Sequence, residues 1–358
     1  MTDRLDEYRR KRDAKRTPEP VPKGRPAPSA VENRFVIQQH HARSLHWDVR
    51  LERDGVLVSF AVPRGLPRDR NRNNLAKHTE DHPLEYLDFH GEIPAGEYGG
   101  GRMTIHDRGT YDIDKWRDDE IGVTFHGDRT SGRYVFFQTG GNDWMVRRMD
   151  PAEPGWEPMP DAVPPMLATR AAGLPEPDQD QDWGYEMSWG GRRTLAFVSG
   201  GRVKLLNADG ADVTAWYPEI RPLGDALAPI EVVLDGEIVA FDGTAPAPEL
   251  LERRKPPRDA AAARRAAERA PVQYLAFDLL WLEGHSTTDQ VRYAQRRELL
   301  EGLSVAGHSW QTPPYFPGGG EFALEAAAAQ GLPGVVAKRL DSPYLPGKRS
   351  KLWLSITA

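Results

Sequence analysis

The stretch QQHHARSLHWDVRLE, residues 38–52, governs how the first half of the chain folds. Within it, residues 46–51 alternate between polar and apolar side chains without exception. This period of two predicts a half-buried β-strand, with His46, Asp48 and Arg50 on one of its faces. Such a face is either solvated, or it directs an imidazole, a carboxylate and a guanidinium at one target.

The same stretch predicts a divalent metal site. His46 and Asp48 stand two residues apart on the expected strand, so their side chains project next to each other. His40 lies six residues earlier and reaches them if the intervening segment folds back as a loop. Two imidazoles and one carboxylate leave coordination positions open, as a catalytic ion requires, and Arg50 can clamp a phosphate oxygen beside it. The residues alone leave a solvated strand face with stray histidines equally open.

Changes in sequence pattern divide the chain into an N-terminal arm, a first domain that contains this strand, a linker and a second domain. Short alternating runs with glycine-rich turns follow one another across residues 31–150, which favours a compact β-barrel or sandwich. Residues 1–30 are charged and punctuated by proline, as expected of a basic N-terminal arm, and residues 151–165 form a proline-rich linker. Over residues 166–358, strand-like runs alternate with helical ones, so we expect an α+β domain.

Composition narrows the class of protein. The 358 residues suggest two domains, and the absence of cysteine excludes disulfides, thiolate zinc sites and cysteine nucleophiles. No apolar run approaches the roughly 18 residues that span a bilayer, and the N-terminus lacks the apolar core of a signal peptide. We therefore expect a cytoplasmic protein with no membrane partner.

Charge is distributed unevenly along the chain. Residues 1–150 carry a net charge of +1, from 26 basic and 25 acidic residues, whereas residues 151–358 carry −7. Nine basic and five acidic residues fall within the first 26 positions. If the protein contacts nucleic acid, the surface that neutralises phosphates is therefore expected in the first half.

Three segments of the first half carry a family resemblance. They are YRRKRDAKRTPEP at residues 8–20, FVIQQHHARSLHWDVRLERDGVLVSFAVPRG at 35–65 and EDHPLEYLDFHGEIPAGEYGGG at 80–101. Together they resemble the 3′-phosphoesterase domain of bacterial LigD-type end-joining ligases. The resemblance implies removal of a 3′-phosphate or a terminal 3′-ribonucleotide from DNA, which leaves a 3′-hydroxyl.

The resemblance also implies roles for individual residues. It implies that Mn²⁺, or another divalent metal, is held by His40, His46 and Asp48. The side chains that contact phosphate or complete the catalytic site fall on Arg50, His82, Tyr86, Arg12, Asp13 and Glu19. Two positions depart from the family. Arg64 replaces a lysine and keeps the charge but not the point-like geometry, and Asn74 replaces an arginine for which Arg70 or Arg72 could substitute.

The second half resembles the adenylylation domain of ATP-dependent DNA ligases of the same LigD type, which implies an α+β nucleotidyltransferase with an ATP-grasp-like fold. The resemblance rests on YEMSWGGRRTLAF (185–197), LDGEIVAFD (234–242), YLAFDLLWLEG (274–284) and GVVAKR (334–339). In that family a lysine attacks the α-phosphate of ATP. In this chain Ser188 stands in its place, and Gly190 replaces the aspartate that follows.

Other nucleotide contacts of that family are also missing. The arginine of an S-R-N-G segment is lost at residues 207–210, Pro333 replaces a glutamate, and Ser355 and Thr357 replace two phosphate-binding lysines. The retained positions of this degenerate site are Arg193, Asp235, Glu237, Phe277 and Lys338. Because the lost groups all addressed the same phosphates, we expect ATP binding to be doubtful and ligation to be absent. No OB-fold is expected after the last motif.

Three functions remain open on the sequence. The intact first site favours a 3′-end-healing phosphoesterase fused to a degenerate ligase domain and associated with the nucleoid. Overall similarity favours an ATP-dependent DNA ligase, which Ser188 opposes, and a non-catalytic scaffold in end joining is the third function. The expected partners are DNA ends, in a primer-template or nicked duplex with a 3′-phosphate or 3′-ribonucleotide, and end-joining proteins such as a ligase, a polymerase or an end-binding protein.

Overall fold

The computed structural model describes residues 3–24 and 33–358. The chain forms two compact units, Met1–Pro154 and Gly155–Ala358, and each is described by itself. No helix within the described residues is both long enough and apolar enough to cross a membrane.

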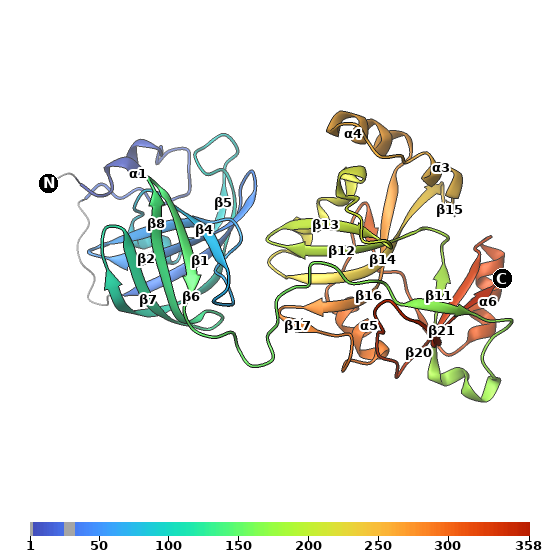
Figure 1. Ribbon diagram of the computed structural model, residues 1–358. Helices are drawn as coiled ribbons and strands as arrows, with labels where there is room; N and C mark the ends of the chain where they lie inside the picture. The colour runs from blue at the N-terminus through green and yellow to red at the C-terminus, as the bar shows by residue number, and fades with distance from the viewer. Residues whose placement is uncertain (1–2, 25–32) are drawn as a thin grey trace. The chain divides into compact units, whose positions relative to one another are not determined.

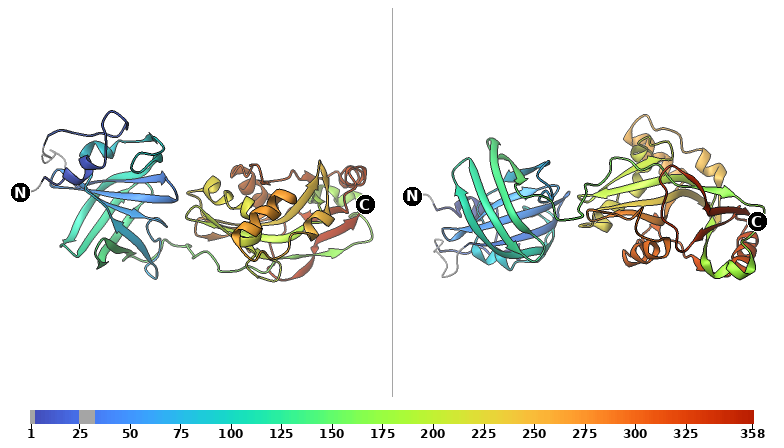
Figure 2. Two further views of the ribbon diagram at one scale, coloured as in Figure 1. Left: turned by 90° about the horizontal axis from the view of Figure 1, so that it is seen from above. Right: turned by 60° about the horizontal axis from the view of Figure 1, so that its bottom comes forward.

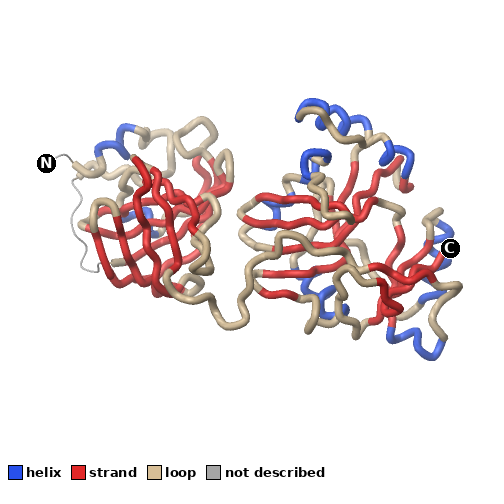
Figure 3. The backbone as a smooth tube through the Cα atoms, in the orientation of Figure 1, coloured by secondary structure: helices blue, strands red, loops and turns tan. Residues whose placement is uncertain are grey.

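The first unit is a closed β-barrel (Figures 1 and 3). Its strands are β1 (Arg34–His41), β2 (Leu45–Arg53), β3 (Val56–Val62), β4 (Asn73–His78), β6 (Gly101–Trp116), β7 (Glu120–Gly127), β8 (Ser131–Gly140) and β9 (Asp143–Arg148). They hydrogen-bond in the order β1-β2-β3-β4-β9-β8-β7-β6, and β6 pairs back with β1. A short strand, β5 (Gly91–Ile93), is added to β6. The predicted β-barrel is confirmed.

The hairpin of β1 and β2 has two buried faces. One face packs aromatic side chains, with the ring of Phe35 centred 4.7 Å from that of Phe125. The other face carries the polar residues, and His40 on β1 is directly opposite His46 on β2. Most of β2 is buried on both faces, so the prediction of a half-buried strand is wrong. The polar face is shielded because other segments of the unit cover it.

The N-terminal segment is one of these covers. Helix α1 (Asp6–Arg10) and the chain that follows it to residue 24 lie outside the strands (Figure 1). Tyr8 is fully buried, and its hydroxyl donates to the carbonyl of Pro20 at 2.7 Å. Tyr8 also packs edge-on against Tyr86 of a 3-10 turn, η1 (Leu84–Leu87). The last residues of the predicted arm, 25–30, lie outside the described part of the chain.

The second unit is α+β, as predicted, and contains two sheets (Figure 2). The smaller sheet has the order β10-β21-β20-β11-β19. Its strands are β10 (Leu167–Arg170), β11 (Trp183–Ser188), β19 (Phe316–Pro317), β20 (Gly334–Arg339) and β21 (Arg349–Thr357). The larger sheet follows the path β13-β12-β14-β16-β17, with β15 beside β14 and β18 beside β16. Its strands are β12 (Arg192–Ser199), β13 (Arg202–Asn207), β14 (Val232–Asp242), β15 (Ala245–Pro246), β16 (Val272–Leu282), β17 (His285–Ser286) and β18 (Trp310–Gln311).

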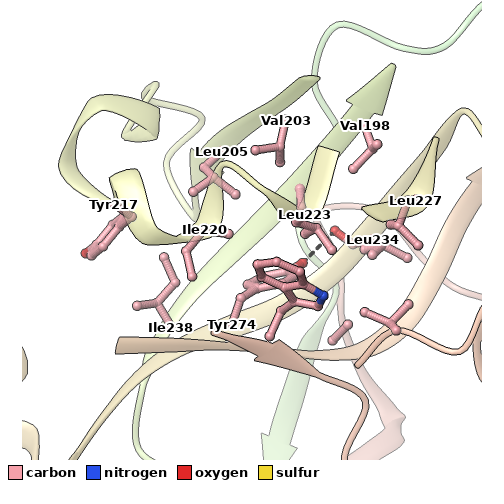
Figure 4. Close-up of a cluster of buried hydrophobic side chains, with 14 of the residues drawn as sticks. Val198, Val203, Leu205, Tyr217, Ile220, Leu223, Leu227, Leu234, Ile238 and Tyr274 are labelled. Atoms are coloured by element: carbon pink, nitrogen blue, oxygen red, sulfur yellow. Dashed lines mark hydrogen bonds between the residues drawn. The ribbon is translucent and has the colours of Figure 1, made fainter. Parts of the chain in front are cut away.

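The helices of this unit follow the two sheets. They are α2 (Leu223–Leu227), α3 (Pro248–Glu252), α4 (Ala260–Arg269), α5 (Tyr293–Gly302) and α6 (Gly320–Ala329). Helix α2 packs on β12 and β13, and its Leu223 and Leu227 enter the largest apolar core (Figure 4). Tyr274 of β16 crosses that core, and its hydroxyl donates to the Leu234 carbonyl at 3.1 Å. The long strands β14 and β16 therefore position Asp235, Glu237 and Phe277 on a rigid scaffold.

Candidate functional site

The first unit contains a cavity of about 1010 Å³ on the polar face of β1 and β2. Its walls come from the N-terminal segment, from β1, β2 and η1, and from the glycine-rich loop between β5 and β6. The structure brings together eight of the predicted residues around it: Arg12, Glu19, His40, His46, Asp48, Arg50, His82 and Tyr86. The predicted loop between His40 and His46 is the short turn of the β1–β2 hairpin.

His40, His46 and Asp48 converge at one end of the cavity, where one potential ligand atom from each lies within 4.8 Å of the others. His40 Nδ1 is 3.5 Å from Asp48 Oδ2, and His46 Nε2 is 3.6 Å from Asp48 Oδ1. The other ring nitrogens face backbone carbonyls, at 2.8 Å from Gly99 and 3.1 Å from Ser44. Because a carbonyl only accepts, those nitrogens carry the protons. The two nitrogens facing Asp48 are therefore free to bind a metal, as metal-binding histidines are usually arranged.

Asp48 and Arg50 form a buried ion pair beside this cluster. Burial alone would raise the pKa of Asp48, but the adjacent guanidinium of Arg50 holds that pKa well below its usual range. Arg50 Nη2 donates to Asp48 Oδ2 at 2.9 Å, and Arg50 Nε donates to Gln38 Oε1 at 2.7 Å. Arg50 Nη1 is buried and has no partner among the described residues. A buried guanidinium N–H without an acceptor is costly, so this geometry suits an anion in the cavity.

His82 is a buried, neutral imidazole. Burial lowers its pKa well below the ordinary value, and the positive charges of Arg50 and Arg12 lower it further. Its Nδ1 lies 2.8 Å from the backbone carbonyl of Glu80 and therefore carries the proton. Its Nε2 is left as an acceptor, 3.3 Å from Arg12 Nη2.

Arg12 connects the N-terminal segment to this site. Its guanidinium donates to Glu19 Oε1 at 2.6 Å and to Glu80 Oε1 at 2.9 Å, and all three side chains are almost fully buried. Tyr86 donates its hydroxyl to Glu19 in a short hydrogen bond, while its ring lies under Arg50, 4.7 Å from the guanidinium carbon. Glu80, which the sequence did not single out, therefore holds both Arg12 and His82.

Three predicted positions lie elsewhere. Asp13 is exposed, and its carboxylate accepts from the backbone of Lys15 at 3.0 Å, so it shapes a turn of the N-terminal segment. Arg64 is exposed and is not among the residues that line the cavity. Asn74 is half-buried and donates to the carbonyl of Gly65 at 2.8 Å.

In the second unit, the retained residues pair with one another. Arg193 binds both carboxylate oxygens of Asp235 at 2.5 Å, and Tyr344 donates to the same carboxylate at 2.6 Å. Lys338 is almost fully buried and lies 2.6 Å from Glu186 Oε2. Burial lowers the pKa of Lys338, and the charges of Glu186 and Asp278 only partly offset this effect.

Both cations also approach the ring of Phe277. Lys338 Nζ lies 4.4 Å and the Arg193 guanidinium carbon 4.7 Å from its centroid. Each contact is within the range of a cation–π interaction. The ring of Phe277 therefore has two protein cations as neighbours.

Ser188 and the residues that follow it lie close to Glu237, Pro333 and Gly334. Ser188 ends β11 opposite Gly334, and within residues 3–24 and 33–358 its hydroxyl has no hydrogen bond to a base. Glu237 instead accepts from the backbone of Gly191 at 2.9 Å. Gly190 adopts a left-handed φ of 69°, and a Cβ at this position would lie 3.3 Å from Cγ of Pro333. The two replaced positions, 190 and 333, are thus in contact with each other.

Comparison with known families gives two matches. Residues 38–138 match the DNA Ligase D 3′-phosphoesterase domain, and residues 165–356 match the ATP dependent DNA ligase domain. Among curated relatives, the multifunctional non-homologous end joining protein LigD of Mycobacterium bovis is 44% identical over 99% of this chain. The LigD protein of Pseudomonas aeruginosa is 31% identical over 98% of this chain. This chain covers 45% and 47% of these two relatives, so it spans about half of their length.

A solved structure is similar over about half of this chain. Mycobacterial DNA ligase D complexed with ATP and MES is 38% identical, with a TM-score of 0.47, over 55% of this chain and 60% of that chain. The two domain matches together extend from residue 38 to residue 356, and the LigD relatives align along almost the whole sequence. The chain therefore belongs to the ATP-dependent DNA ligase domain family, in the LigD type that also carries a 3′-phosphoesterase domain.

Proposed function

We propose that the first unit is a divalent-metal-dependent phosphoesterase that removes a 3′-phosphate or a 3′-terminal ribonucleotide from DNA ends. The observation that carries this proposal is the buried Nη1 of Arg50, which has no partner within residues 3–24 and 33–358 and lies beside the cluster of His40, His46 and Asp48. Hydrogen-bond donors of this kind bind phosphoryl oxygens, and the cluster offers the ligand types that a catalytic ion prefers. The match of residues 38–138 to the LigD phosphoesterase domain supports the same activity.

The donor set fits Mn²⁺ or a similar divalent ion. Two neutral imidazole nitrogens and one ionised carboxylate would hold it, with Gly99 and Ser44 fixing the orientation of the two rings. When bound, such an ion supplies Lewis-acid polarisation of a phosphoryl oxygen.

The chain's own residues account for the remaining chemistry. Arg50 neutralises the charge that develops on the phosphoryl oxygens, and Arg12 adds a second positive charge from the N-terminal segment. His82 is neutral with its proton on Nδ1, so its Nε2 accepts a hydrogen bond rather than donating one. This state favours orientation of a water or of a protonated phosphoryl oxygen over general-acid protonation of the leaving group.

We further propose that the second unit does not ligate and that its binding of ATP is weak. Ser188 cannot replace a lysine nucleophile without a positioned base, and a serine-linked AMP would be a poor donor. The cations Arg193 and Lys338 are committed to Asp235 and Glu186, so they are less available to nucleotide phosphates. In this reading, the protein trims DNA ends in the cytoplasm near the nucleoid, and end-joining proteins supply the sealing step.

The test uses purified protein with Mn²⁺ and ATP on a labelled nicked duplex. One substrate carries a 3′-phosphate or a single 3′-ribonucleotide at the nick, and the other carries a 3′-hydroxyl and a 5′-phosphate. We expect trimming of the first and no sealing of the second. The His46→Ala variant should lose trimming by at least about 100-fold, as expected for loss of a metal ligand. His126→Ala, which removes an exposed histidine of β7, should trim normally.

The alternatives give different products. Sealing of the 3′-hydroxyl nick would favour an ATP-dependent DNA ligase, in keeping with the match of residues 165–356. Neither trimming nor sealing would favour a non-catalytic scaffold. If the His46→Ala variant still trimmed the 3′ end at the wild-type rate, this result would contradict the proposed site.

A further inference from the structure

One aromatic side chain in the cavity has no role in the proposed chemistry. Six large hydrophobic side chains are exposed in the described residues, and Tyr98 alone among them lines this cavity. Its relative exposure is 49%, whereas Tyr8 and Tyr86 nearby are at most 1% exposed. Tyr98 therefore presents ring surface to the space where substrate is expected.

The backbone of Tyr98 is firmly held next to the proposed metal ligands. The following residue, Gly99, accepts a hydrogen bond from His40, and adjacent Cα atoms are only about 3.8 Å apart. The preceding residue, Glu97, forms an ion pair with Arg16 of the N-terminal segment at 2.6 Å. The Gly100 N–H closes the turn by donating to the Glu97 carbonyl at 3.1 Å. A fixed backbone lowers the entropy that the ring would lose on binding a ligand.

Two cations lie against the same ring. Lys11 Nζ is 4.8 Å and the Arg12 guanidinium carbon 5.4 Å from the centroid of Tyr98, and Lys11 Nζ lies 3.4 Å from its hydroxyl. Both cations are already paired with carboxylates, Lys11 with Glu7 and Glu80 and Arg12 with Glu19 and Glu80, so the ring is the part left open to a ligand. An exposed aromatic ring in a positively charged groove is an arrangement with which proteins bind single-stranded nucleic acid, because the ring stacks on a base.

We propose that Tyr98 stacks on the nucleobase at the 3′ end of the DNA and thereby positions the terminal phosphoryl group at the cluster of His40, His46 and Asp48. This inference rests on the proposed phosphoesterase function and adds a base-binding residue to it. Tyr98 is a positioning residue that acts through substrate binding, so its loss should raise KM more than it lowers kcat. Every base has a stacking face, so the contact favours an end that carries a base without selecting its identity.

The experiment separates stacking from turnover. The first measurement follows binding without metal, using DNA whose 3′-phosphorylated terminal nucleoside carries 2-aminopurine, because stacking quenches the fluorescence of this base. The second measures kcat and KM with Mn²⁺ on the ordinary 3′-phosphorylated end and on one whose terminal nucleoside is abasic. The variants are Tyr98→Leu and Tyr98→Phe, and the control is Phe322→Leu, which removes the exposed aromatic ring of α6.

We expect quenching by the wild type, Tyr98→Phe and Phe322→Leu, with binding weakened about tenfold in Tyr98→Leu. KM for the base-bearing end should rise by a similar factor in Tyr98→Leu, while the abasic end is processed as by the wild type. The proposal would be overturned if Tyr98→Leu raised KM equally for the base-bearing and the abasic end, or if this variant quenched the fluorescence as the wild type does. If quenching depends on Tyr98 but no protein trims either end, the base-binding site stands and the phosphoesterase function fails.

Discussion

At the scale of single residues, the hydrogen bonding of the site depends on which ring nitrogen of each histidine carries the proton. Backbone carbonyls of Gly99, Ser44 and Glu80 each hold one ring nitrogen of a histidine in the cavity. These contacts select a tautomer for each ring without adding charge to the site. Asp48 is held ionised beside Arg50, and the positive charges of Arg50 and Arg12 favour the neutral form of His82.

His82 is therefore expected to stay neutral. Its pKa in the folded protein is lowered, so the unfolded chain binds a proton first as pH falls. The resulting stability is fully present above about pH 6.5, the ordinary value, and declines as pH falls below it. Nitrogen-detected NMR should show His82 protonated at Nδ1 alone from pH 6 to 8, and should show it titrating near pH 6.5 in urea. A titration midpoint at or above 6.5 in the folded protein would contradict this prediction.

The sequence predicted the core of this site but not its surroundings. His40, His46, Asp48 and Arg50 could be grouped because a two-stranded hairpin obeys a local period. The family resemblance added His82 and the arm residues. Glu80 and Tyr98 were missed, since their roles depend on where the N-terminal segment folds back, and no local pattern encodes that contact.

At the scale of elements, the N-terminal segment is held by charge as well as by apolar packing. Glu80 pairs with Arg12 at 2.9 Å and with Lys11 at 3.0 Å, and its side chain is 2% exposed. Burial raises the pKa of Glu80, but the hydrogen bonds from Arg12 and Lys11 outweigh burial and leave the pKa lowered. Docking of α1 should accordingly depend on the ionisation of this one carboxylate.

The Glu80→Gln variant tests this dependence. It leaves Arg12 with one fewer buried counterion, so backbone amides of residues 6–10 should exchange with solvent at least about tenfold faster at neutral pH. In the wild type, Glu80 stabilises the docked segment above about pH 4.3, and this stabilisation is lost as pH falls below that value. Protection factors from hydrogen exchange at several pH values provide the measurement.

Glu85→Gln serves as the control, since Glu85 is exposed in η1. It should leave exchange in residues 6–10 unchanged. If the amides of residues 6–10 exchange at the wild-type rate in Glu80→Gln, apolar packing around Tyr8 is sufficient to hold the segment.

Element prediction succeeded where hydrophobic alternation was strong. The short alternating runs expected across residues 31–150 became β1, β2, β3 and β6 to β9. Among the helical runs expected over residues 166–358, the alanine-rich one became helix α4. Strand β4, with the sequence NNLAKH, was missed because its composition is polar and only Ala76 is buried. It is a strand because β3 and β9 pair with it on either side, and closure of the barrel requires this strand.

At the scale of the whole molecule, one chain combines the cluster of His40, His46 and Asp48 with a second unit whose buried charged residues pair with one another. In the second unit, Lys338 forms an ion pair with Glu186, and Arg193 forms one with Asp235. The sequence predicted which family residues are absent. It could not predict how the retained ones pair, because those contacts join strands far apart in the chain.

Replacing the nucleophile alone should not restore ligase chemistry. The Ser188→Lys variant should form no covalent AMP adduct with labelled ATP, because Pro333, Ser355 and Thr357 still lack the family's charges. A variant that also carries Gly190→Asp, Ala208→Arg, Pro333→Glu, Ser355→Lys and Thr357→Lys is the matched comparison and should form the adduct. Adduct formation by Ser188→Lys alone, seen on a denaturing gel, would show that the remaining site still binds ATP productively.

The close approach of position 190 to Pro333 couples substitutions at these two positions. An aspartate at position 190 would have to adopt a left-handed backbone with its Cβ only 3.3 Å from the proline ring. Replacing Pro333 at the same time would remove this crowding. The effects of Gly190→Asp and Pro333→Glu on stability are therefore expected to be non-additive, as is usual for residues that share a contact.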